Sequence, residues 1–229
     1  MFYDVHTHST LSIGEDSPEA MAQFARRLGF SGISVVRYHD AIATVPRFSG
    51  IELIDAVMIK PANAHELGTL AAAVRNSCDL LMVHGGDFNV NRAACENPMV
   101  DVLCHPDLGR KDSGLDHVCI KAAAENKVAI EVNFREILES YRKKRIHVLA
   151  GMKKNVRLAR KYGAPVITAS GAVTRYGLRS GRELAAVAHL LGLELGSAID
   201  SLSSLPAELL RMNKEKRAHR RWEGVHISG

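Results

Sequence analysis

Short apolar runs alternate with amphipathic stretches along nearly the whole chain, and this alternation restricts the fold more than any other feature. Runs such as 79–83 carry few polar residues, as strands buried on both faces do. Strands and helices in regular alternation predict a parallel sheet with helices packed on it. The expected strands are residues 2–5, 32–36, 51–59, 79–84, 99–104, 128–133 and 165–169.

Helices are expected between these strands. The first is predicted to begin at Ser17 and Pro18, a capping residue followed by a proline at the first helical position, and to end at Gly29. The apolar spacing predicts the others at about 62–76, 89–96, 114–126, 145–162 and 180–191, with a last helix over 207–221.

Two α/β architectures satisfy this pattern, an open doubly wound sheet and a closed barrel. No Gly-x-Gly-x-x-Gly follows a strand, so a dinucleotide-binding fold has no support from motifs. We therefore favour a TIM-barrel-like (β/α) barrel at the small end of the usual size range. A single barrel domain is predicted over residues 1–213, followed by a basic C-terminal tail over 214–229.

The charge is distributed unevenly between the two halves of the chain. Residues 1–134 hold 11 Lys and Arg against 17 Asp and Glu, a net of −6, whereas residues 135–229 hold 19 against 8, a net of +11. A basic half of this kind favours an anionic partner such as nucleic acid, although a solvated basic surface is the plain alternative.

Nothing in the sequence resembles a targeting segment or a membrane span, which leads us to expect a cytoplasmic protein without a membrane partner. The four cysteines form no Cys-x-x-Cys pair, so structural zinc and a disulfide framework are not expected.

Histidines recur near the ends of the predicted strands. His6 and His8 follow the first strand and fall on the same side of it, because extended backbone alternates its side chains. In a parallel barrel all carboxyl ends of the strands share one face, where the βα loops build sites. A metal or anion pocket is therefore expected at this face, and its candidate residues are His6, His8, His39, Glu52, His84 and His105.

The opening segment, Asp4-Val5-His6-Thr7-His8-Ser9, resembles the first motif of the polymerase-and-histidinol-phosphatase (PHP) superfamily of metal-dependent phosphoesterases, which are distorted barrels. In that resemblance the six candidates fall near the family's ligand positions. Two motifs depart from the pattern. Arg37-Tyr38-His39 stands where the family usually has Thr-Asp-His, and Ser170-Gly171-Ala172-Val173 stands where it usually has Ser-Asp-Ala-His. The loss of a carboxylate and an imidazole argues against efficient hydrolysis by the chain alone.

A narrower resemblance, from Phe2 to about Asn213, is to the p30-type subunits (protein component 3) of archaeal and eukaryotic ribonuclease P, which are PHP-related but catalytically degenerate. It rests on the segments His84-Gly85-Gly86-Asp87, Asn91-Arg92-Ala93-Ala94, Val100-Asp101-Val102-Leu103-Cys104-His105-Pro106 and Ala169-Ser170-Gly171-Ala172.

This resemblance implies a subunit of an enzyme that removes the 5′ leader from precursor tRNA and whose RNA holds the catalytic centre. The expected partners are ribonuclease P RNA, precursor tRNA, a Pop5-like component 2 and other protein subunits. The chain would hold no catalytic residue and require no cofactor, although a residual divalent metal is compatible with the surviving histidines. The alternative is a PHP-type phosphoesterase with altered ligands.

Only 5% of the residues are aromatic, which favours contacts to the backbone of structured RNA over base stacking. Candidates for RNA contact come from two places, the loops in or beside the strand ends and the basic run at 142–145. The predicted RNA-binding residues are Arg92, Arg110, Arg175, Arg179, Arg142, Lys143, Lys144 and Arg145.

Overall fold

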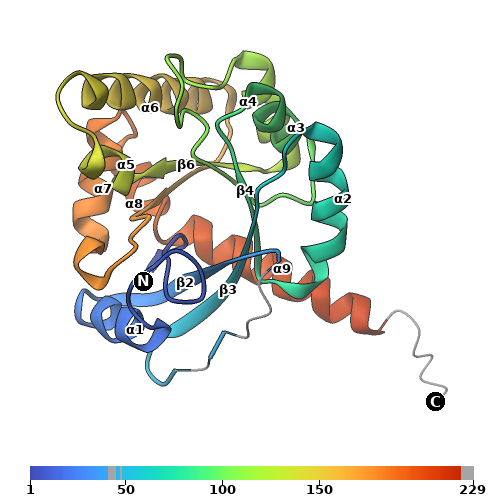
Figure 1. Cartoon of the computed structure of the whole chain (residues 1–229), viewed down its shortest axis with the longest axis vertical. Coiled ribbons are helices and arrows are strands. Elements are labelled where there is room, and N and C mark those ends of the chain that lie inside the picture. Colours follow the sequence, from blue (N-terminus) through green and yellow to red (C-terminus); the bar gives the residue numbers. More distant parts are fainter. Residues whose placement is uncertain (41–44, 47, 223–229) are drawn as a thin grey trace.

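The computed structural model describes residues 1–40, 45–46 and 48–222, and in it all seven predicted strands form one parallel sheet (Figure 1). Each strand pairs with the next one in the sequence, so the spatial order follows the chain order. The strands are β1 (Phe2–Asp4), β2 (Phe30–Tyr38), β3 (Glu52–Ile59), β4 (Leu80–His84), β5 (Val102–Cys104), β6 (Ala129–Asn133) and β7 (Val166–Ala169).

The sheet curls until β7 approaches β1, which makes a nearly closed barrel. At the carboxyl end the seam is direct, because the Gly171 N–H donates to the His6 carbonyl at 2.9 Å and the His8 N–H donates to the Ala172 carbonyl at 2.8 Å. At the amino end, a segment from the C-terminal part of the chain lies between the two strands. The Thr168 N–H donates to the Ser201 carbonyl and the Tyr3 N–H to the Leu202 carbonyl. The predicted barrel is therefore confirmed.

Helices cover the outside of the barrel, as predicted. Ser17 caps the first one by accepting a hydrogen bond from the Ala20 N–H, and Pro18 occupies its first position. Two short helices that the sequence did not predict, α5 and α8, are also present. The helices are α1 (Pro18–Arg27), α2 (Ala64–Val74), α3 (Phe88–Glu96), α4 (His117–Asn126), α5 (Phe134–Glu139), α6 (Lys143–Tyr162), α7 (Gly181–Leu190), α8 (Leu195–Asp200) and α9 (Ser204–Trp222), with 3₁₀ turns η1 (Arg75–Ser77) and η2 (Arg175–Gly177).

Helix α9 closes the amino end of the barrel. Leu210 is buried against the barrel interior, and the Asn213 amide donates to the Asp79 carbonyl and to the Asp101 carboxylate, each at 3.0 Å. The helix continues beyond residue 213, and Lys214 and Arg217 pair with Glu52 and Asp79. The division into a domain over 1–213 and a tail over 214–229 stays a prediction, with residues 214–222 helical and 223–229 outside the described residues.

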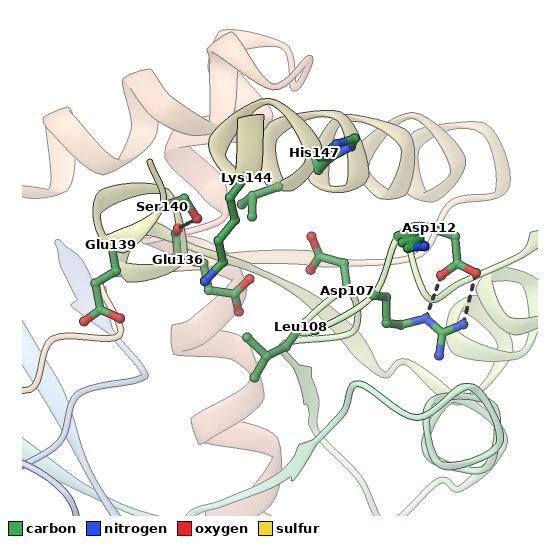
Figure 2. Close-up of a pocket in the computed structure, with 12 residues that line it drawn as sticks. Asp107, Leu108, Asp112, Glu136, Glu139, Ser140, Lys144 and His147 are labelled. Carbon is green, nitrogen blue, oxygen red and sulfur yellow. Dashed lines mark hydrogen bonds and ion pairs between the residues drawn. The ribbon is translucent and has the colours of Figure 1, made fainter. Parts of the chain in front are cut away.

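The carboxyl end of the barrel is more open. The loop after β5 and the start of α6 face each other across a pocket of about 450 Å³ (Figure 2). Asp107 and Glu136 lie on its inner side and Lys144 and His147 on α6. None of the helices in the described part of the chain combines the length and the apolarity that crossing a membrane requires.

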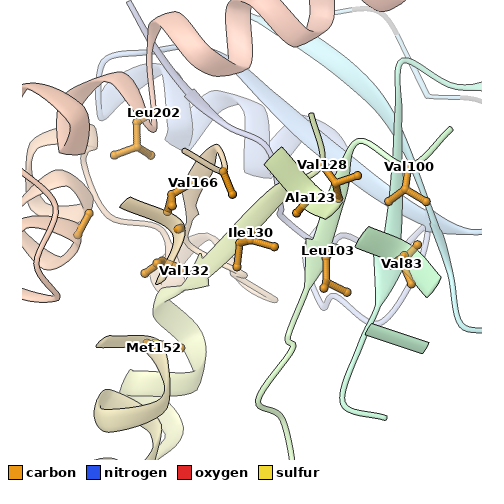
Figure 3. Packing of buried hydrophobic residues seen from close by; sticks show 14 of the residues in the cluster. Val83, Val100, Leu103, Ala123, Val128, Ile130, Val132, Met152, Val166 and Leu202 are labelled. Atoms are coloured by element: carbon orange, nitrogen blue, oxygen red, sulfur yellow. The ribbon is translucent and has the colours of Figure 1, made fainter. Parts of the chain in front are cut away.

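The core has two layers, because strand side chains alternate between the two faces of the sheet. One cluster, which includes Ile54, Met58 and Met82, fills the barrel interior. The other packs the outer face of the strands against the helices, as Val83, Leu103, Ile130 and Met152 do (Figure 3). The interior is thus packed with side chains, and chemistry is confined to the rim of the barrel.

Candidate functional site

Three buried side chains converge at the carboxyl end of the barrel. His6 Nδ1 lies 2.5 Å from Glu131 Oε1, and the His105 backbone N–H donates to Glu131 Oε2 at 3.2 Å. One ligand atom from each of the three residues falls within 4.8 Å of the others, an arrangement that suits a divalent cation. The donor set of two imidazoles and one carboxylate therefore fits a metal ion at this position.

Local backbone geometry brings these residues together. His6 follows β1 in extended backbone and is held by the hydrogen bond from Gly171. Glu131 and Asn133 are two residues apart in β6, so both side chains point toward the same side, and the Asn133 amide donates to Glu131 at 3.1 Å. His105 follows β5 with φ 52°, a left-handed conformation that is uncommon for residues other than glycine.

Further groups surround this cluster. His8 Nε2 lies 3.1 Å from His6 Nε2, and the His84 ring centroid lies 5.1 Å from that of His105. Glu136, from α5, forms a hydrogen bond with His105 Nδ1. The predicted convergence of His6, His8, His84 and His105 is therefore present in the structure.

Burial and mutual proximity set the charge state of the cluster. Burial alone would raise the pKa of Glu131, but His6, His105 and the hydrogen-bonded neighbours outweigh it and hold that pKa well below its usual value. Burial, reinforced by His6, lowers the pKa of His8 to about 2, and burial raises the pKa of Asp4 to about 6. Glu131 is therefore anionic, whereas burial favours the neutral forms of His8 and Asp4.

The two remaining predicted ligands lie apart from the cluster. Glu52 was expected at this face, and that expectation is wrong. It opens β3 opposite Gly32, at the amino end of the barrel, where it pairs with Lys214 of α9. His39 follows β2 at the carboxyl end, but no hydrogen bond or ring contact in the described residues joins it to His6 or His105, and its Nδ1 is buried without a partner.

Sequence reasoning missed three residues that complete this face, namely Glu131, Glu136 and Arg135, whose positive charge acts on His8, His105 and Glu136. A signal for Glu131 was available, because a carboxylate inside the apolar run 128–132 must be paired if it is buried. Arg135 and Glu136 lie in α5, which follows β6 without a loop and is too short to show a helical period. The pattern in the sequence therefore held no comparable signal for these two.

The motif that departs from the PHP pattern has a clear structural counterpart. Gly171 has φ 63°, and a Cβ placed on it would lie 2.4 Å from Asn133 Oδ1. The Asn133 side chain thus occupies the space that a side chain at position 171 would need. The missing carboxylate cannot be restored there without displacing Asn133.

The pocket beside the cluster is lined by two buried carboxyl groups, those of Asp107 and Glu136 (Figure 2). Burial, with Glu131 nearby, raises the pKa of Glu136 to about 8. Burial, with Glu136 nearby, raises the pKa of Asp107 to about 7. Lys144 and His147 face the same pocket from α6. This side of the rim therefore disfavours the ionised form of both carboxyl groups.

Asp107→Asn is expected to stabilise the protein at pH 8 and to have little effect at pH 4. Asp107 ionises near 3.8 in the unfolded chain and near 7 in the folded one. Stability is consequently lost as the pH rises through this interval, by up to ~4 kcal/mol above pH 7. Urea denaturation at both pH values measures the effect.

Asp112→Asn on the same loop is the control, and it is expected to destabilise the protein at pH 8, because Arg110 lowers the pKa of Asp112 to about 2 and so favours its ionised form. An Asp107→Asn protein no more stable than the wild type at pH 8 would contradict the expectation.

The predicted RNA-binding arginines occupy different settings. Arg110 lies at the carboxyl face, where it pairs with Asp112 and donates to the Gly86 carbonyl at 3.0 Å. Arg175 pairs with Asp16 at 2.8 Å, and the Arg179 guanidinium lies 5.5 Å from the centre of the Phe134 ring. Arg92 lies on the outside of α3, paired with Glu96.

The basic run is placed at one corner of the rim. Arg142 precedes α6 with φ 49°, and its guanidinium lies 5.0 Å from the centre of the exposed Tyr141 ring. Lys143, Lys144 and Arg145 form the first turn of the helix and are exposed. Arg110 and Lys144 line the same pocket, so part of the basic run adjoins the barrel mouth.

Known proteins similar to this chain identify its family. Residues 1–218 match the family described as RNase P subunit p30. The chain is 39% identical over 230 residues to ribonuclease P protein component 3 of Methanosarcina mazei, covering 99% of this chain and 95% of that protein. It is 33% identical over 219 residues to the component 3 of Methanothermobacter thermautotrophicus, covering 91% and 88% respectively.

Solved structures agree with this family and with the barrel fold. A chain in a cryo-EM structure of archaeal ribonuclease P with mature tRNA has a TM-score of 0.76 and 25% identity, covering 98% of this chain and 96% of that one. Histidinol phosphate phosphatase from Lactococcus lactis, complexed with zinc, L-histidinol and phosphate, has a TM-score of 0.59 and 12% identity, covering 84% and 94%, which shows the fold alone. Since family and relatives span the chain almost end to end, this chain belongs to the RNase P subunit p30 family.

Proposed function

We propose that this chain is a protein subunit of ribonuclease P and supports removal of the 5′ leader from precursor tRNA. The observation that carries the proposal is the match to component 3 proteins along almost the entire chain and almost the entire length of those proteins. The similar chain in the archaeal ribonuclease P structure with mature tRNA supports the same role. Its partners in this role are RNA and other protein subunits, among them a Pop5-like component 2.

The RNA of the complex supplies the catalytic centre in this proposal, and the isolated chain does not cleave RNA. The rim of the barrel supports this assignment. Gly171 and Val173 carry no metal-binding side chain, and Asn133 fills the space beside Gly171. A site that activates water for phosphodiester hydrolysis needs enough ligands to hold its ions and to balance their charge.

A residual divalent cation remains part of the proposal, held by His6, His105 and Glu131. Such an ion would add rigidity to the rim, because it would replace hydrogen bonds between histidine and carboxylate by coordinate bonds. The same cluster is the one observation that favours the alternative function, a metal-dependent phosphoesterase.

Reconstitution with ribonuclease P RNA and the other protein subunits distinguishes the two functions. We expect cleavage of precursor tRNA to depend on adding this chain and to survive in the His8→Gln variant. His8 is chosen because it adjoins His6 without pairing with Glu131.

Assays of the purified chain alone complete the test. We expect no phosphodiester hydrolysis with Mg²⁺, Mn²⁺ or Zn²⁺. Metal-dependent hydrolysis by the wild type that disappears in His8→Gln, together with no effect of the chain on precursor-tRNA cleavage, would establish the alternative instead.

A further inference from the structure

Helix α6 carries charge of only one sign. Its 20 residues include eight Lys and Arg and not one Asp or Glu. Surface helices usually interleave the two signs, because pairs of opposite charge three or four residues apart stabilise them. α3 and α9 follow this usual pattern with the pairs Arg92–Glu96 and Arg211–Glu215. Helix α6 therefore departs from the way that this same chain builds other exposed helices.

Four Lys and Arg side chains of α6, together with His147, lie on one face of the helix. Lys143, His147, Lys154, Arg157 and Lys161 recur every three, four or seven residues, so they share one face of the helix. From residue 143 to residue 161 this face is about 27 Å long at the α-helical rise. We call these five residues, together with the adjoining Lys153, the α6 stripe.

Little in the described part of the chain neutralises this stripe. Lys143, Lys153, Lys154 and Arg157 are exposed and form no ion pair with a described residue. Glu194 pairs with Arg160 at 2.6 Å, beside the stripe, and Asp112, which pairs with Arg110, lies near enough to Lys154 to interact with its charge. The positive charge therefore faces solvent over several turns of the helix.

A groove runs along the middle of the stripe. It has a volume of about 430 Å³ and separates α6 from the turn at Leu191 and Gly192. No carboxylate lines it, and its four charged lining residues are Lys153, Lys154, Arg157 and Arg160. Arg160 is fixed at its edge, because its guanidinium donates to the Gly192 carbonyl at 2.7 Å. The charged groups of the groove are thus all cationic, they lie beside apolar lining from Ala150 and Leu191, and one guanidinium is held in place.

The first turn of α6 places positive side chains where the helix dipole is also positive. Lys143, Lys144 and Arg145 occupy the first turn, where the helix dipole disfavours positive charge by about 0.3–1 kcal/mol per residue. Arg142 at the cap position offers no side-chain hydrogen bond to the free N–H groups. A polyanion lying along the stripe would relieve this repulsion at the same end of the helix.

We propose that the α6 stripe and its groove bind the phosphate backbone of a folded RNA, as a contact surface that begins beside the mouth of the barrel and extends along α6 away from it. The inference rests on the proposed function, since the RNA in question is that of ribonuclease P. Lysine is depleted in the core of protein–protein interfaces, whereas phosphate contacts favour it. Five of the six stripe residues are Lys or Arg, and Ile146 at the edge of the stripe is the one large exposed apolar side chain of the helix, too little for the apolar core of a protein interface, which favours RNA over an acidic protein.

Neutralising the middle of the stripe tests this inference. We compare the wild type with Lys153→Gln/Lys154→Gln/Arg157→Gln for binding of the full chain to ribonuclease P RNA from 50 to 300 mM KCl. The slope of log affinity against log salt is expected to fall by about 2–3, and affinity at 150 mM to fall tenfold or more. The three side chains are exposed, so the melting temperature is expected to stay within 2–3 °C of the wild type.

A matched control removes the same charge elsewhere. Arg26→Gln/Arg27→Gln/Arg211→Gln changes exposed cations on α1 and α9. We expect this variant to keep the salt slope within about 1 of the wild type. If both triple variants lose affinity equally, net charge alone explains the loss and the inference is overturned. It is also overturned if the α6 variant keeps its RNA slope but loses an acidic protein subunit of the complex.

The two proposals fail in different ways. If the wild-type chain neither binds the RNA nor supports cleavage of precursor tRNA, the proposed function fails. If the wild type does both and the α6 variant matches it in slope and affinity, only the surface assigned to α6 is wrong.

Discussion

Replacing Glu131 by alanine is expected to lower the free energy of unfolding by about 3–5 kcal/mol. The carboxylate is fully buried and accepts hydrogen bonds from three partners, the His6 ring, the Asn133 amide and the His105 backbone N–H. Its loss leaves all three buried groups without that acceptor and opens a cavity at the rim. Urea denaturation followed by circular dichroism at pH 7 measures the change.

Two variants and a pH series control this experiment. Glu125→Ala on the exposed face of α4 is expected to change stability by less than about 0.5 kcal/mol. Glu131→Gln keeps a hydrogen-bond acceptor, so its loss of unfolding free energy is expected to lie between those of Glu131→Ala and Glu125→Ala. Because the folded pKa of Glu131 is lowered, its contribution is present above the unfolded pKa of about 4.5 and is lost as the pH falls toward the folded value. A difference between Glu131→Ala and Glu125→Ala below 1 kcal/mol at pH 7 would show that the cluster does not hold the rim together.

Gly114→Ala is expected to destabilise the protein by about 3–5 kcal/mol, for a purely steric reason. Gly114 has φ 69°, and a Cβ built there would lie 1.8 Å from the Pro106 carbonyl oxygen. That oxygen belongs to the backbone of a buried loop, and it accepts a hydrogen bond from the Asn91 amide at 2.8 Å. Asn91 also donates to the Gly114 carbonyl, so the substitution strains the link between α3 and the β5–α4 loop.

Gly109 in the same loop separates conformational strain from steric overlap. Its φ is 73°, nearly the same as at Gly114, but nothing lies within 4 Å of a Cβ built on it. Gly109→Ala is therefore expected to cost only the left-handed conformation, about 1–2 kcal/mol. Thermal unfolding of both variants gives the comparison. Equal melting temperatures would mean that the loop relaxes freely around Gly114 and that the contact with Pro106 is unimportant.

The barrel could be predicted from the sequence because the strands are short buried runs and most of them are separated by helices with their own apolar period. The boundaries were less accurate where a cap overrides the apolar pattern. The pattern predicted a helix from residue 114, but α4 begins at His117, since Asp116 accepts hydrogen bonds from the Val118 and Cys119 N–H groups. Strand β5 is also shorter than predicted, because the sheet pairs only Val102–Cys104 in this region.

The site was predicted in part, and the errors share a cause. Histidines that follow a strand could be assigned to the carboxyl face from the parallel topology alone. Glu52 could not, because its place depends on whether it begins or continues β3, and that is decided by its register against Gly32. Glu131 lies inside a strand, where the direction of its side chain depends on pairing with β5 and β7. Residues whose role depends on register need the three-dimensional structure.

The seam between β7 and β1 has a consequence for biosynthesis. Every strand pairs with its predecessor, so the sheet can grow in the order in which the ribosome releases the chain. The amino end of the seam is different, because it waits for Ser201 and Leu202, and the interior beneath it waits for Leu210 of α9. A nascent chain that lacks its last 30 residues therefore holds a curled sheet with an uncovered apolar interior. The apolar interior of this barrel is therefore covered only after its final helix has been made.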